Sequence, residues 1–180
     1  MKKQPAVSAE YERVTHTFGP VYDVDSKILI LGSMPSVKSR EQQFYYGHPQ
    51  NRFWKVLPAV FGETVPETIA EKRDFLLRNN VALWDVIESC DIVGSSDSSI
   101  KNVRANDMNV ILSEADISTI FLNGGKAYEL FLKYCGKNVL EGGHALVKLP
   151  STSPANAAWS LEKLTESWTG LIRQNSRALR

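Results

Sequence analysis

Residues 27–54, KILILGSMPSVKSREQQFYYGHPQNRFW, decide the fold. They begin with an aliphatic run, 28–31, that stops at the turn sequence Gly32-Ser33-Met34-Pro35-Ser36. Such a run, ended by Gly and Pro, predicts a buried strand and a tight turn at the edge of a sheet. The aromatic and polar cluster at 45–54 should then lie beyond the carboxyl end of that strand, where open α/β folds bind ligands. An aromatic ring, an amide and a turn of small residues favour a pocket for a planar, hydrogen-bonding ligand such as a nucleobase.

Four apolar runs, 27–31, 81–84, 118–122 and 145–149, are typical of strands. Between them, apolar residues at i, i+3, i+4 and i+7 spacing predict helices at 53–61, 125–134 and 161–172. Strands that alternate with helices favour βαβ crossovers. The sequence therefore predicts an α/β fold, a three-layer α/β/α sandwich around a central, mainly parallel four-stranded sheet. We expect one domain over 1–180, with residues 1–10 mobile.

The composition is that of an ordinary soluble globular protein, with 180 residues, 43% hydrophobic residues and 23% charged residues. No apolar run approaches the roughly 18 residues of a membrane span, and the first residues lack the apolar region of a secretory signal. Cys90 and Cys135 are too far apart for a CxxC pair, and no His/Cys/Asp cluster has metal-ligand spacing. We therefore expect a cytoplasmic monomer that uses no metal and no cofactor and does not bind membranes.

The most loop-like stretch is GSSDSS at 94–99, which we place between a strand and a helix. It could be a linker. A long polar loop in the middle of a domain is more often functional, so we do not divide the chain there. The net charge of +1 does not decide whether the chain binds nucleic acid, because a local basic surface is sufficient. The cations near the segment 32–54 or after the Ser-rich loop either form such a surface or are simply solvated; they are Lys38, Arg40, Arg52, Lys55, Lys101 and Arg104.

The sequence also resembles a known family. GSMPS at 32–36 and YYGHPQNRFW at 45–54 look like motif 1 of the uracil-DNA glycosylase superfamily, in the form most similar to its hypoxanthine (deoxyinosine) DNA glycosylase branch. The mismatch-specific uracil-DNA glycosylases share HPxNRFW but carry Asn where this chain has Met34. LPSTSPAN at 149–156 resembles motif 2, and VALWD at 81–85 takes the place of the base-reading strand. The likeness covers roughly residues 27–171, in the same order.

The resemblance implies an enzyme that flips a deaminated base out of double- or single-stranded DNA and hydrolyses its N-glycosidic bond, the first step of base excision repair. Superfamily enzymes often hold the attacking water with a polar residue at the position of Met34, whose thioether is a poor partner. The resemblance implies that Asn51 contributes to catalysis instead, although Asn51 could also cap a helix that begins at Arg52. His48 is either a general acid or base or a residue that shapes the turn before Pro49.

The resemblance also suggests a base-binding set. Tyr46 stands where mismatch-specific relatives carry a base-stacking Phe, although it could equally be a core aromatic. Asp85 aligns with the Asn that reads uracil; an ionised Asp only accepts, which suits N1–H of hypoxanthine, although it could also cap the next turn. Gly32 and Ser33 would offer backbone amides to a base carbonyl, with Met34 beside them.

Motif 2 would contact DNA. The hydroxyls and backbone N–H groups of Ser151, Thr152 and Ser153 suit the phosphates that flank a flipped nucleotide. Asn156 would also contact DNA, and the segment after Pro154 would wedge into the duplex.

Three other functions remain as alternatives. A uracil-specific mismatch-type glycosylase is the main one, and a non-enzymatic nucleotide-binding module comes next. A Ser/His/Asp hydrolase fits poorly, because GSMPS is not a GxSxG nucleophile elbow. A phosphate-binding loop fails, because no GK[ST] follows Gly32.

Overall fold

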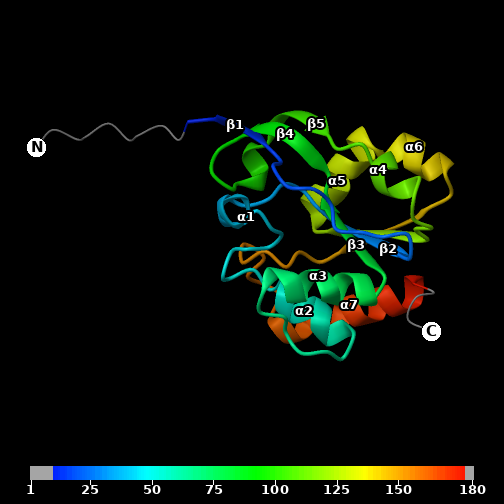
Figure 1. Cartoon of the computed structure of the whole chain (residues 1–180). Coiled ribbons are helices and arrows are strands. Elements are labelled where there is room, and N and C mark those ends of the chain that lie inside the picture. Colours follow the sequence, from blue (N-terminus) through cyan, green and yellow to red (C-terminus); the bar gives the residue numbers. More distant parts are fainter. Residues whose placement is uncertain (1–9, 177–180) are drawn as a thin grey trace, which may run out of the picture.

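The computed structural model describes residues 10–176 and contains two sheets (Figure 1). The central sheet is parallel throughout, with strand order β3-β2-β6-β7. Its strands are β2 (Ile28–Gly32), β3 (Val81–Asp85), β6 (Thr119–Asn123) and β7 (Ala145–Leu149). Each begins and ends within one residue of the strand predicted from the sequence. The expected mobility of residues 1–10 falls almost entirely outside the described part of the chain.

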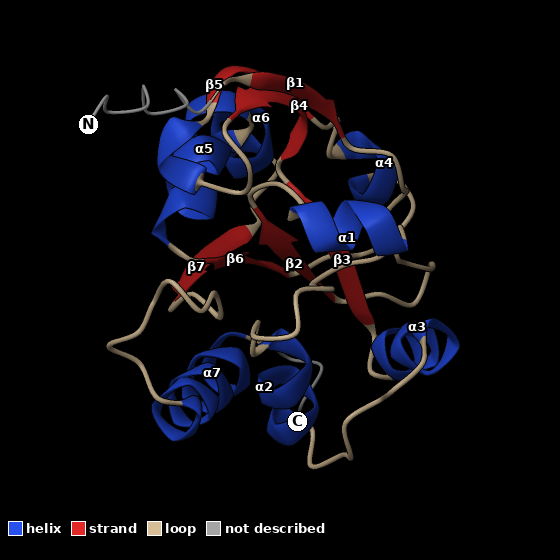
Figure 2. Ribbon diagram, turned by 90° about the vertical axis from the view of Figure 1, so that its left-hand side faces the viewer, coloured by secondary structure: helices blue, strands red, loops and turns tan. Residues whose placement is uncertain are grey.

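Helices cover both faces of the central sheet (Figure 2). One layer contains α2 (Phe53–Val60), α3 (Ile69–Arg78) and α7 (Leu161–Asn175). The other contains α4 (Asn109–Leu112), α5 (Gly125–Tyr134) and α6 (Gly136–Glu141), while α1 (Val37–Gln42) follows the β2 turn. The predicted α/β/α sandwich is therefore confirmed.

The second sheet was not predicted. It is antiparallel, with strand order β1-β4-β5, and its strands are β1 (Glu12–Thr15), β4 (Ile87–Ile92) and β5 (Lys101–Ala105). Strand β4 follows β3 after a single residue, so the chain passes directly from one sheet to the other. Residues 94–99 thus connect two antiparallel strands, and our placement of this loop before a helix was wrong. The loop contains a short 3₁₀ turn, η1 (Asp97–Ser99).

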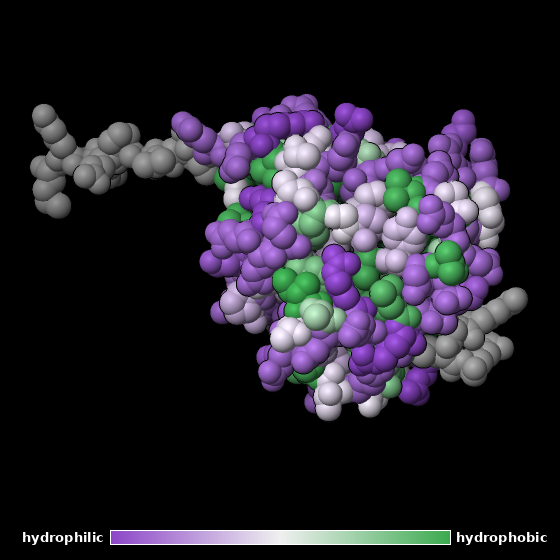
Figure 3. Space-filling model, in the orientation of Figure 1, coloured by the Kyte–Doolittle hydropathy of each residue, from purple (hydrophilic) through white to green (hydrophobic). Residues whose placement is uncertain are grey.

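The core lies on both faces of the central sheet. All five residues of β2 are buried, as parallel strands covered by helices require. Large aromatic side chains fill the layer beneath the sheet, where Phe53 packs edge-on against Trp54 and Trp168. On the face seen in Figure 3, hydrophobic side chains reach the surface only in small groups among hydrophilic ones. Within residues 10–176 we find no helix with the length and apolar character needed to cross a membrane.

Strand order determines where a ligand site can form. From β2 the chain moves to β3 on one side, then returns to β6 and β7 on the other, so the winding direction reverses between β2 and β6. In open α/β sheets, the crevice outside the carboxyl ends of the strands at such a reversal is the usual ligand site. Gly32, Asp85 and Asn123 end β2, β3 and β6, respectively.

Candidate active site

A cavity of about 270 Å³ opens at these strand ends. Pockets for drug-sized ligands usually measure about 300–1,000 Å³, so this cavity suits a smaller ligand such as a single base. The cavity brings together every site residue predicted from the sequence except Asn156. Its predicted lining residues are Gly32, Ser33, Met34, Tyr46, His48, Asn51, Asp85, Ser151, Thr152 and Ser153. The sequence reasoning had not identified Asp97 or Asn123, which also line it.

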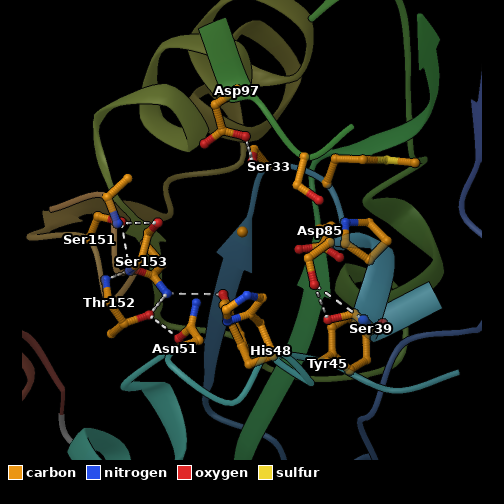
Figure 4. Close-up of a pocket in the computed structure, with 18 of the residues that line it drawn as sticks. Ser33, Ser39, Tyr45, His48, Asn51, Asp85, Asp97, Ser151, Thr152 and Ser153 are labelled. Atoms are coloured by element: carbon orange, nitrogen blue, oxygen red, sulfur yellow. Dashed lines mark hydrogen bonds between the residues drawn. The ribbon is translucent and has the colours of Figure 1, made fainter. Parts of the chain in front are cut away.

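A hydrogen-bond network joins three distant parts of the chain at this cavity (Figure 4). The Thr152 hydroxyl donates to Oδ1 of Asn51 at 2.9 Å and accepts from Nδ2 of Asn123 at 2.9 Å. The Thr152 backbone N–H donates to Oδ1 of Asn123 at 3.0 Å. Nδ2 of Asn123 also donates to the Tyr46 hydroxyl at 3.1 Å. Since Thr152 is fully buried, its hydroxyl acts within this network, and the predicted phosphate contact through that hydroxyl remains untested.

Of the two roles that the sequence left open for Asn51, the structure shows a contact at the start of α2, and the catalytic role remains a prediction. Its Oδ1 accepts from the backbone N–H of Phe53, the first residue of α2, at 3.0 Å. The helix begins one residue later than expected and its N-cap position is taken by Arg52, so Asn51 supports the helix start from the residue before the cap. A backbone N–H can only donate, so this contact fixes which end of the amide is oxygen. Because Oδ1 also accepts from Thr152, both of its lone pairs are engaged. The N–H groups of Nδ2 are the part of the amide left to act on a ligand.

Asp85 is buried at the end of β3, with 3% of its surface exposed. Its Oδ2 lies 2.8 Å from Nε2 of His16, whose side chain is 2% exposed, and its backbone carbonyl accepts from Nδ2 of Asn106. The carboxylate thus contacts a buried histidine and does not cap the following turn. A Cβ atom at Gly32 would lie 2.5 Å from Oδ1 of Asp85 and 2.9 Å from the Tyr46 hydroxyl. Only glycine at position 32 lets these two oxygens approach the end of β2.

Tyr46 occupies an unusual backbone conformation, with φ of +53°. This left-handed region is uncommon for residues with a Cβ and is often found at functional sites. One face of its ring stacks on Phe53, with centroids 3.9 Å apart and planes inclined by 13°. Stacking on a ligand would therefore use the opposite face. Tyr45 is different, because it is buried and donates its hydroxyl to the carbonyl of Gly19.

His48 stabilises the turn at residues 48–51, within motif 1. Its Nδ1 accepts from the backbone N–H of Gln50 at 3.2 Å, and its carbonyl accepts from that of Asn51. Since Nδ1 accepts, the neutral ring carries its proton on Nε2, which makes Nε2 a donor. His48 lines the cavity, so this donor is a candidate for contact with a ligand oxygen or nitrogen.

The side chain of Arg52 binds backbone carbonyl oxygens of motif 2 and the residues after it. Its guanidinium donates to the carbonyl oxygens of Ser153 at 2.7 Å, Asn156 at 3.1 Å and Trp159, and its Nε donates to that of Thr152 at 3.3 Å. The fixed fork of guanidinium donors suits this use. Arg52 is therefore not simply solvated, and its part in a local basic surface remains a prediction. The Asn156 side chain donates to the carbonyl of Ser151 within the same loop. The predicted contact of Asn156 with DNA remains a prediction.

Asp97 faces the cavity from the loop 94–99, on the side away from Asn51 and Thr152 (Figure 4). Its Oδ1 accepts from the Ser33 hydroxyl at 2.9 Å. Surrounding protein removes this carboxyl group from part of its water, which raises its pKa above the ordinary value; the Ser33 hydrogen bond and the charge of Lys126 act in the opposite direction. Among residues 10–176, no three His, Cys, Asp or Glu side chains gather to form a metal site.

The sheet and the cavity define an α/β protein with a cavity of the size of a small ligand at the strand ends, lined largely by polar residues. Residues 20–172 match the model of the Uracil DNA glycosylase superfamily, and the chain belongs to this superfamily. It is 35% identical over 159 residues to hypoxanthine DNA glycosylase from Methanosarcina acetivorans, a match that covers 87% of this chain and 96% of that protein. The enzyme of the same name from Methanosarcina barkeri is 36% identical over 123 residues, covering 66% of this chain and 78% of that protein.

A solved structure agrees with these matches. It is a solution NMR structure from Methanosarcina acetivorans, provisionally described as a uracil DNA glycosylase. It superimposes with a TM-score of 0.72 at 34% sequence identity, covering 87% of this chain and 95% of that chain.

Proposed function

We propose that this protein is a DNA-deoxyinosine glycosylase that hydrolyses the bond between hypoxanthine and deoxyribose in DNA, the first step of base excision repair. The observation that carries the proposal is the buried carboxylate of Asp85, which lines a cavity of the size of a nucleobase. An ionised carboxylate only accepts hydrogen bonds and therefore suits N1–H of hypoxanthine. The relatives named hypoxanthine DNA glycosylase support the same substrate.

In the proposed mechanism, some residues recognise the base and others stabilise the charge that it gains. Asp85 accepts from N1–H, and the free face of Tyr46 stacks on the purine, which contributes about 1–3 kcal/mol. The N–H groups of Asn51 and His48 donate to acceptor atoms of the purine and stabilise the negative charge that it gains as the bond breaks. Gly32, Ser33 and Met34 form the turn beneath the base. Ser151, Ser153 and Asn156 hold the flanking DNA backbone.

The enzyme is proposed to act as a cytoplasmic monomer on double- or single-stranded DNA that contains deaminated bases, without a metal or a cofactor. It is also proposed to be monofunctional, because neither motif contains a lysine placed to form a Schiff base. Borohydride should therefore trap no covalent adduct with DNA, and EDTA should not reduce activity.

The decisive experiment compares single-turnover cleavage of matched duplexes that contain inosine, uracil or xanthine at one position. We expect inosine to be cleaved fastest. The superfamily and the description of the solved relative favour uracil as the second candidate. Faster cleavage of uracil than of inosine would replace the proposed function with a uracil-DNA glycosylase, and release of no base would leave a nucleotide-binding module.

A further inference from the structure

Hydrolysis requires a group that accepts a proton from the attacking water. Met34, at the position where superfamily enzymes often hold that water, has a thioether that accepts weakly. Both lone pairs of Asn51 Oδ1 are engaged by Phe53 and Thr152. In His48, Nδ1 accepts from a backbone N–H. None of these three residues is free to take the proton.

The remaining titratable side chains of the cavity are Tyr45, Tyr46, Asp85 and Asp97. Burial raises the pKa of both tyrosines far above the ordinary value, so both are neutral and are poor proton acceptors. Asp85 is 3% exposed and lies against Gly32 and His16, in the position that we assign to base recognition. Asp97 alone combines a carboxylate, a place in the cavity and exposure to solvent, from which the water would come.

We propose that Asp97 is the catalytic carboxylate that orients the attacking water and accepts its proton. The proposal rests on the glycosylase function proposed above. The water oxygen forms a bond to C1′ of the deoxyribose as the C1′–N9 bond breaks, and the electron pair of that bond leaves with the base. One proton of the water passes to Asp97 and then to solvent, and the departing base takes up a proton to become neutral hypoxanthine.

The surroundings of Asp97 fit this role. Ser33 begins the turn after β2 and donates to Oδ1, which leaves Oδ2 for the water. Partial desolvation raises the pKa of the carboxyl group, which makes the ionised form a stronger base. Glycoside hydrolysis commonly divides its work between two carboxylates on opposite sides of the reacting bond, and here Asp85 would hold the base while Asp97 serves the water.

The test uses the full chain with Asp97→Asn and Asp97→Ala. Asparagine keeps an oxygen that can accept from Ser33 but loses the basic carboxylate. We expect either variant to lower single-turnover cleavage of an inosine duplex by roughly 10²-fold, with DNA affinity and melting temperature close to wild type. Asp74→Asn on α3 is the matched control, because Asp74 is exposed and does not line the cavity, and it should cleave at the wild-type rate.

Chemical rescue gives a second measurement, because formate would not restore activity if Asp97 had a purely structural role. Sodium formate should restore part of the activity of Asp97→Ala, whereas sodium chloride at equal ionic strength should not. Cleavage by Asp97→Asn within about threefold of wild type would overturn the assignment. If the wild-type protein releases hypoxanthine while both variants remain active, only the role of Asp97 fails. If wild type releases no hypoxanthine, uracil or xanthine, both the glycosylase function and this role fail.

Discussion

The two walls of the cavity are held in different ways. On one side, motif 2 is fixed by the buried Thr152, by Asn123 and by the guanidinium of Arg52, which binds carbonyl oxygens along the loop. On the other, the loop 94–99 is exposed through most of its length and is tethered by single serine contacts, such as the Val37 N–H to the Ser95 hydroxyl. The N–H groups of Asn51 thus lie against a wall with many hydrogen bonds, which we call the rigid wall, whereas the proposed water-binding carboxylate lies on an exposed loop with few, which we call the adjustable wall.

Breaking the rigid wall should have the largest effect. Arg52→Ala leaves the carbonyl oxygens of Thr152, Ser153 and their neighbours without a cationic donor. We expect the free energy of unfolding to fall by about 3 kcal/mol, since hydrogen bonds to charged groups contribute about 1.5–3 kcal/mol each and are not additive. Urea denaturation measures this change. Arg52→Lys should lie between wild type and Arg52→Ala, because lysine keeps the charge without the fork. Unchanged unfolding with weakened DNA binding would instead make Arg52 a phosphate contact.

Asn51 tests whether the rigid wall supplies a donor or merely a cap. Asn51→Ala should lower single-turnover cleavage of inosine by roughly 10²-fold or more, while the free energy of unfolding falls by only about 1 kcal/mol. Asn51→Asp is the informative comparison, because aspartate still accepts from Phe53 and Thr152 but has no N–H. It should be nearly as stable as wild type and as slow as Asn51→Ala. A large loss of stability with near-normal cleavage would leave Asn51 as a cap only.

Asp85 lies between the two walls and should control specificity. In Asp85→Asn, Nε2 of His16, which lies 2.8 Å from Oδ2 of Asp85, would donate to the asparagine oxygen and turn the NH₂ group towards the base. That NH₂ donor would face N1–H of hypoxanthine, which is also a donor, but it would match O4 of uracil, which accepts. We expect the ratio of inosine to uracil cleavage to fall by at least about tenfold, because unmatched buried polar groups discriminate strongly. Parallel single-turnover assays on both duplexes measure the ratio. An unchanged ratio would place Asp85 outside base recognition.

The smallest loss of activity should come from the contact between the β2 turn and the adjustable wall. Ser33→Ala removes the hydrogen bond that lowers the pKa of Asp97, so this pKa should rise further above its ordinary value. Lys126, which lowers the same pKa, and Asp85, which raises it, both remain. Cleavage requires ionised Asp97 and is lost as pH falls through this pKa, so the acidic limb of the rate profile should move to higher pH. The plateau rate should fall by less than about tenfold. A limb that does not move would separate Ser33 from the titrating group.

The sequence predicted the central sheet because each strand is a short apolar run and the intervening helices have regular apolar stripes. It did not predict β1, β4 and β5, whose exposed and buried residues are mixed. Strand β1 pairs with β4 across a long stretch of chain, as Glu12 does with Ile92, and the local pairing of β4 with β5 is interrupted by register shifts. Two residues were missed because only tertiary contacts bring them into place: His16, which contacts Asp85, and Asp97, which lines the cavity. Asn123 could have been found, because it directly follows a predicted strand that pairs with β2, as Asp85 does.

The network of Asn51, Asn123 and Thr152 has a consequence for biosynthesis. Its hydrogen bonds join residues 29 and 101 positions apart, and Thr152 lies after the last strand of the sheet. Translation delivers the chain from the amino end, and contacts between distant positions form late because closing long loops costs entropy. A nascent chain that ends before residue 152 therefore has the β2 turn but not its partner wall. The ability to hold an extruded base should appear abruptly, once the segment that contains Thr152 has been synthesised.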